Sequence, residues 1–143
     1  MLSLKSESLR YLLVGEVALI LIQAIIGMYL NLYVIVPFPI NFIAFAFSLQ
    51  GAVFGFHHLF AILILLFAAV IFIFSFRMKN SSLIKTSILG LVLLAVSYVG
   101  GTAFVFLQPN NFYSLIMAAT AIVALVVYTS EIFGMRALST HDS

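Results

Sequence analysis

Four long apolar stretches constrain the fold of this chain more than any other feature of its sequence. They cover about residues 9–36, 56–76, 84–107 and 112–133. A helix of about 20 apolar residues is long enough to cross the hydrocarbon core of a bilayer. Because lipid offers no partners to backbone polar groups, such segments cross it as α-helices. The sequence therefore predicts an all-α integral membrane protein, a four-helix bundle in which residues 1–143 form a single transmembrane domain.

The composition excludes several classes of protein. Hydrophobic residues make up 65% of the chain and charged residues only 7%, which lies outside the range of soluble globular proteins. The absence of cysteine excludes disulfides, thiolate metal sites and cysteine nucleophiles. Six Lys and Arg residues are too few for a nucleic-acid-binding surface. We expect the partners to be the lipid bilayer and membrane proteins, either larger subunits or further copies of this chain.

The basic residues predict how the bundle is oriented. All of them lie at or before the start of the first stretch, between the second stretch and the start of the third, or after the fourth: Lys5, Arg10, Arg77, Lys79, Lys85 and Arg136. The other two connections contain no charged residue. Because Lys and Arg are enriched in cytoplasmic loops, both termini are predicted to be cytoplasmic in a multi-pass protein of the plasma membrane.

The first outer connection contains Pro37 and Pro39, which are predicted to end the first helix. The apolar segment that follows, about residues 40–50, is too short to span a bilayer. We expect it to form a short helix along the outer interface or a re-entrant cap over the bundle.

Polar residues on the first stretch share one helical face. Glu16, Gln23, Gly27 and Asn31 follow one another at steps of seven, four and four residues, so this face is predicted to look into the bundle. For Glu16, two interpretations stay open. It is an interfacial residue capped by Arg10, or a buried group that serves as a proton relay or a quinone contact.

Small residues on the last two stretches predict where helices pack closely, because they let backbones approach in lipid. The third stretch offers Gly90, Ser97, Gly100 and Gly101, and the fourth offers Ala118, Ala121 and Ala124.

Two adjacent histidines, His57 and His58, begin the second stretch in GFHHLFAILILL. Such residues can simply reach water or headgroups from a helix mouth, or they can bind haem, bind a metal ion or transfer protons. The outer half of the chain supplies no carboxylate or thiolate to complete a metal site beyond a haem iron. Neighbouring helical residues point about 100° apart, so at most one of the pair faces the bundle.

Haem needs only one or two axial ligands and an apolar slot between helices. Met117 lies near the outer end of the fourth stretch, at a depth comparable with that of His57. We therefore predict that any haem b is bound by His57 with Met117 as the second ligand. His58 is the fallback ligand, and a pair of His57 residues from two copies is a further alternative.

Three segments together resemble one four-helix unit of the haem A synthase family: LIQAIIGMYLNLYVIVPFP, GFHHLFAILILL and SYVGGTAFVFLQPNNFYSLIMAA. The resemblance implies that His57 matches the family's ligand histidine. It places Ile116 or Met117 where the family has a second histidine. Phe54 stands where the family has a glutamate implicated in methyl oxidation, and Asn31, Leu32 and Tyr33 replace an arginine and polar residues. It therefore implies a related bundle that holds haem or has lost it, and Phe54 disfavours that enzyme activity.

Two functions from different classes follow. The first is a b-type cytochrome-like subunit that transfers electrons. The alternative is a cofactor-free accessory subunit of a larger respiratory or oxidase-type membrane complex. A transporter is disfavoured, because broken helices near the midplane are expected there and the prolines lie in the outer connections.

Overall fold

The computed structural model describes residues 2–34, 42–107 and 111–139, and the described part of the chain is helical with short connections. The elements are α1 (Leu2–Tyr33), α2 (Phe42–Ala46), α3 (Leu49–Arg77), α4 (Ser81–Phe106) and α5 (Asn111–Ser139). Among these residues, four helices, α1, α3, α4 and α5, are long and apolar enough to cross a membrane. This confirms the predicted all-α four-helix architecture.

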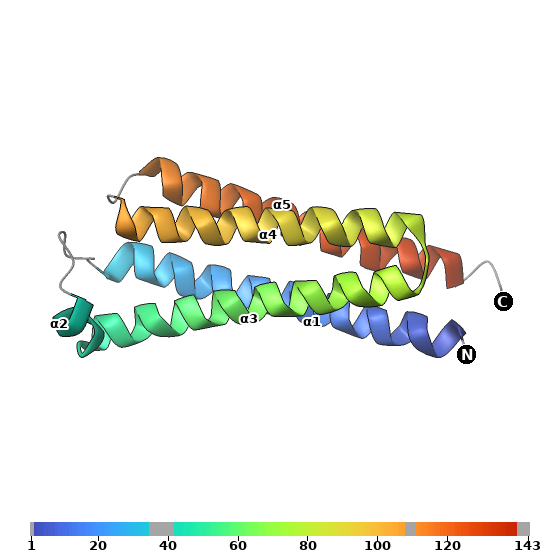
Figure 1. The fold of residues 1–143 in the computed structure, drawn as a ribbon, viewed down its shortest axis with the longest axis horizontal. Coiled ribbons are helices and arrows are strands. Elements are labelled where there is room, and N and C mark those ends of the chain that lie inside the picture. Colours follow the sequence, from blue (N-terminus) through green and yellow to red (C-terminus); the bar gives the residue numbers. More distant parts are fainter. Residues whose placement is uncertain (1, 35–41, 108–110, 140–143) are drawn as a thin grey trace.

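The four long helices form a bundle in which each helix packs against two others (Figure 1). The order around the bundle is α1, α3, α4 and α5, and α5 packs back against α1. The start of α1, the α3–α4 turn and the end of α5 lie at one end, which we call the turn end. The opposite end carries α2 and is called the α2 end. Consecutive long helices therefore run antiparallel, as short connections dictate.

Local capping explains the tight turn between α3 and α4. Lys79 follows the C-cap residue Met78 and adopts a left-handed conformation with φ of 55°, which is common just after a helix. Asn80 is the N-cap of α4, and its side-chain oxygen accepts hydrogen bonds from the backbone N–H groups of Ser82 at 2.9 Å and Leu83 at 3.3 Å. The turn therefore satisfies backbone groups at both helix ends.

The start of α3 differs from the expected start of the second span near Phe56. Ser48 is the N-cap, and its hydroxyl oxygen accepts a 2.9 Å hydrogen bond from the N–H of Gly51. The helix therefore begins at Leu49, and the two histidines lie well inside it rather than at its mouth.

The expected interfacial segment at residues 40–50 is divided between α2 and the start of α3. Of the described helices, only α3 contacts α2, and the rings of Phe45 and Phe54 lie 5.9 Å apart. The helix α2 thus packs on α3 at the α2 end of the bundle. Pro37 and Pro39 lie outside the described residues; α1 ends at Tyr33, before them.

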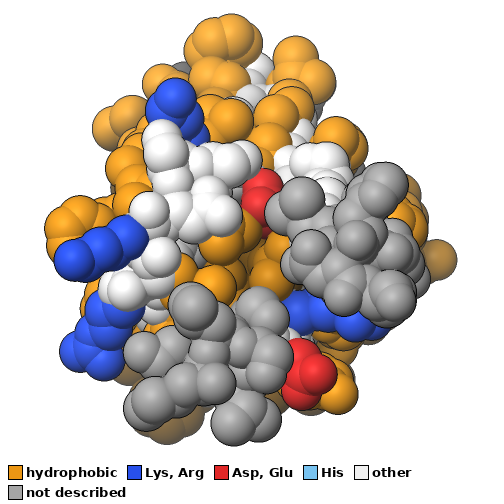
Figure 2. Space-filling view, turned by 90° about the vertical axis from the view of Figure 1, so that its right-hand side faces the viewer, with side chains coloured by type: hydrophobic (Ala, Val, Ile, Leu, Met, Phe, Trp, Pro, Cys, Tyr) orange, Lys and Arg blue, Asp and Glu red, His pale blue; other side chains and the backbone are white. Residues whose placement is uncertain are grey.

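The buried residues concentrate in the half of the bundle nearer the turn end. Each long helix contributes to this layer, which includes Leu9, Leu13, Ala68, Ile71, Leu83, Ala124, Tyr128 and Ile132. Large apolar side chains cover much of the outer surface, as expected of a bundle surrounded by lipid. Figure 2 views the turn end, where Lys and Arg side chains lie on the left and at the lower right, and acidic and hydrophobic side chains are also visible.

Candidate functional site

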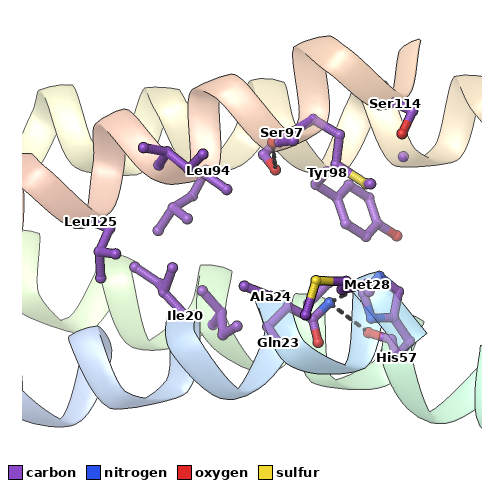
Figure 3. A pocket seen from close by; sticks show the side chains of 18 of the residues that line it. Ile20, Gln23, Ala24, Met28, His57, Leu94, Ser97, Tyr98, Ser114 and Leu125 are labelled. Atoms are coloured by element: carbon purple, nitrogen blue, oxygen red, sulfur yellow. Dashed lines mark hydrogen bonds between the residues drawn. The ribbon is translucent and has the colours of Figure 1, made fainter. Parts of the chain in front are cut away.

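A cavity of about 440 Å³ occupies the α2-end half of the bundle, between the α1–α3 pair and the α4–α5 pair (Figure 3). Its lining is mainly apolar and includes many small side chains: Ala24, Gly27, Ala61, Ser97, Gly101, Ser114, Ala118 and Ala121. None of the described lining residues is charged. Its volume and apolar character are typical of a site for a small molecule.

His57 and Met117 line this cavity from different helix pairs. His57 projects from α3 over Gly27 of α1, where an added Cβ atom would lie 3.1 Å from its Cε1 atom. Met117 projects from α5 over Gly101 of α4, where an added Cβ atom would lie 2.9 Å from the sulfur. The two glycines thus make room for the two candidate ligands on opposite walls.

Gln23 holds His57 from the neighbouring helix. The side-chain Nε2 of Gln23 donates a 3.0 Å hydrogen bond to the backbone carbonyl of His57 and lies 3.4 Å from the ring Nε2 (Figure 3). Within the described part of the chain, His57 Nδ1 and Gln23 Oε1 are buried and have no hydrogen-bond partner. Buried polar atoms normally have partners, so these two are candidates to contact a ligand.

His58 does not line the cavity, but its side chain contacts Tyr98, which does. Its Nε2 atom lies 2.9 Å from the hydroxyl oxygen of Tyr98 on α4, with the two rings 5.2 Å apart. The adjacent histidines therefore have different partners, and His58 joins α3 to α4.

The predicted polar face of α1 is divided between two environments. Gln23, Gly27 and Asn31 line the cavity. Glu16 lies nearer the turn end than the cavity and is 0% exposed. Neither of its carboxyl oxygens has a hydrogen-bond partner among the described residues. Arg10 therefore does not cap Glu16. A spacing of six residues corresponds to about 600° around a helix, which directs the two side chains to different faces.

The cavity opens between α1 and α5. Lining residues on these helices are exposed, and Met28 and Ile122 are each 61% exposed. No lining residue on α3 or α4 is classed as exposed. This opening, which we call the α1–α5 mouth, faces the side of the bundle, where lipid would lie in a membrane.

The chain was compared with models of protein families, with curated proteins and with solved structures. None of the three comparisons found a match.

The cavity meets some of the requirements of a haem site. An imidazole nitrogen without a partner lies opposite a thioether, and both are axial ligands of haem iron in other proteins. Small side chains around them leave space for a flat ring. No group of three His, Cys, Asp or Glu residues lies together among residues 2–34, 42–107 and 111–139, but haem does not require one. Phe54, which the family resemblance aligns with a glutamate, does not line the cavity.

Sequence patterns did not reveal two of the contacts in this region. Tyr98 fits an interfacial aromatic belt by position, but in the structure it is the partner of His58. The contact of Gln23 with His57 joins residues 34 positions apart. Each contact depends on how a helix is rotated about its axis. The sequence indicates this rotation only weakly, through the polar residues that share one face of α1.

Proposed function

We propose that this chain is a multi-pass protein of the plasma membrane that binds haem b in its cavity and transfers electrons. The observation that carries the proposal is that His57 and Met117 line one apolar cavity from opposite helix pairs. In this proposal His57 is one axial ligand and Met117 is the second. His57 faces the cavity of its own bundle. Haem bound within a single chain is therefore favoured over haem held between two copies by a pair of His57 residues.

The proposed orientation places the turn end and both termini in the cytoplasm. Arg77, Lys79 and Lys85 are exposed at or near the α3–α4 turn, and cytoplasmic loops are enriched in such residues. The cavity then lies in the outer half of the membrane.

The residues around the cavity have separate roles in this proposal. Gln23 fixes the orientation of His57 through its backbone and ring contacts, as outer partners of metal-bound histidines do. Gly27 and Gly101 clear space beside the two ligands. The apolar lining excludes water, which affects the potential of a bound haem. A bound haem would supply one-electron redox chemistry.

A difference spectrum tests this function directly. We expect the protein, purified gently from its native membrane, to show stoichiometric b-type haem bands in a dithionite-reduced minus air-oxidised spectrum. The particle mass should be measured on the same sample. A colourless protein with intact helical structure would contradict the haem proposal.

The α1–α5 mouth provides a second test, because a bulky side chain there should obstruct the cavity. Ala118 is an exposed lining residue, so Ala118→Trp should weaken haem binding by about tenfold or more, since overpacking typically costs about 1–3 kcal/mol. The neighbouring Ala119 is exposed but does not line the cavity. Ala119→Trp is therefore a matched control that should bind haem normally. Equal haem titrations for the two variants would argue against this mouth.

The second candidate function is a cofactor-free accessory subunit of a larger respiratory or oxidase-type membrane complex. It is favoured by the lack of a basic side chain in the described cavity lining, since haem propionates would find no cationic partner there. A colourless protein that co-purifies stably in a large complex would support this alternative.

A further inference from the structure

Glu16 and Tyr128 form a second polar group that the cavity does not use. Both side chains are 0% exposed. Within the described residues, neither carboxyl oxygen of Glu16 nor the hydroxyl of Tyr128 has a hydrogen-bond partner. Glu16 belongs to α1 and Tyr128 to α5, two helices that pack together.

An apolar layer separates this pair from the cavity. Ile20 lies one helical turn from Glu16, and Leu94 and Leu125 face the same end of the cavity. On the opposite side of the pair, the ring of Tyr128 packs directly against Gly90 of α4. Glu16 and Tyr128 are therefore enclosed by the bundle and are distinct from His57 and Gln23.

The residues around Glu16 determine whether its carboxyl group is protonated or ionised. Towards the turn end, α3 and α4 bury the apolar residues Ala68, Ile71 and Leu83. They also bury Ser75 and Ser87, whose hydroxyls donate hydrogen bonds to the backbone carbonyls of Ile71 and Leu83 on their own helices. The charged side chains of Arg77 and Lys85 are exposed at the surface. A carboxylate buried without a partner is strongly disfavoured, whereas a carboxylic acid and a phenol can each donate and accept a hydrogen bond.

We propose that Glu16 and Tyr128 form a proton-binding site inside the bundle. Glu16 holds an exchangeable proton as a carboxylic acid, and the hydroxyl of Tyr128 is its polar neighbour. Release of the proton leaves a carboxylate to which the Tyr128 hydroxyl can donate a hydrogen bond. Ionisable residues inside membrane helices commonly take part in proton transfer. The site is independent of the haem proposal, since it uses no residue of the cavity.

Infrared spectroscopy can test this site, because the chain has only four acidic residues: Glu7, Glu16, Glu131 and Asp142. At neutral pH, in a detergent without ester carbonyls, we expect a carboxylic-acid C=O band that shifts in D₂O. Glu16→Gln should abolish the band, whereas the control Glu131→Gln should retain it. Tyr128→Phe should keep the band but shift its frequency, because the neighbouring hydroxyl is lost.

The outcomes are distinguishable from those of the haem test. A band that survives in Glu16→Gln, or its absence from the wild-type protein, would overturn the proton site whether or not the protein is coloured. Circular dichroism should confirm that the variants are folded. If Glu16→Gln does not fold, the wild-type protein and Tyr128→Phe still test the proposal. An unchanged band frequency in Tyr128→Phe would contradict the pairing of Glu16 with Tyr128.

Discussion

His57→Ala should abolish the haem absorbance of the purified protein. The substitution removes the imidazole of His57, which lines the cavity and whose buried Nδ1 atom has no hydrogen-bond partner among the described residues. Loss of a partner that only orients a metal ligand typically lowers metal affinity about 10–100-fold, so loss of the ligand itself should cost more. Haem content per protein, measured after purification and after haem titration, gives the result.

The adjacent histidine is a matched control for this change. His58→Ala removes a side chain that contacts Tyr98 and does not line the cavity, so we expect it to retain haem. Its stability should fall by only about 0.6 kcal/mol, the average for an interhelical hydrogen bond in a membrane bundle. Met117→Leu should keep haem bound through His57, with an altered spectrum and potential. Haem loss in His58→Ala but not in His57→Ala would reverse the ligand assignment.

Gly90→Leu should strongly destabilise the bundle. A Cβ atom at Gly90 would overlap with the far end of the Tyr128 ring, and the Tyr128 side chain is 0% exposed. Overpacking typically costs about 1–3 kcal/mol, and we expect a loss of about 3 kcal/mol or more because leucine adds further carbon atoms. Unfolding in detergent, followed by circular dichroism, measures this change.

Two controls separate the steric effect from the general effect of replacing glycine. Nothing lies within 4 Å of a Cβ atom added at Gly55 or Gly134. Gly55→Leu and Gly134→Leu should therefore be neutral or stabilising by up to about 1 kcal/mol, through helix propensity. A smaller residue at Tyr128 should partly rescue Gly90→Leu, and a lack of coupling between the two positions would show that their contact does not explain the loss.

The long helices were predictable because a stretch of about 20 apolar residues has the length and composition of a membrane-spanning helix. Their ends were harder to predict. Ser48 starts α3 by capping Gly51, but it is one hydroxyl within a continuous apolar segment. The early start of α3 therefore had no strong signal in composition or hydropathy.

Part of the candidate site was predictable from helix geometry. Helix geometry alone implies that His57 and His58 point in different directions, and the depth of Met117 follows from its distance along α5. Which histidine faces the cavity depends on how α3 is rotated against α1, where Gly27 accommodates the ring of His57. The close fit of Tyr128 on Gly90 likewise arises only when α4 and α5 meet.

The buried core and the cavity occupy different depths of the bundle. Most residues that hold the helices together lie towards the turn end, and the residues that would contact a ligand lie towards the α2 end. Ile20, Ile64 and Leu94 belong to both regions, but lining residues outside the core, such as Ala118 and Ala121, can change with little loss of folding stability. Over evolution, a bundle of this kind can lose one ligand or acquire another of different shape while its helices stay assembled.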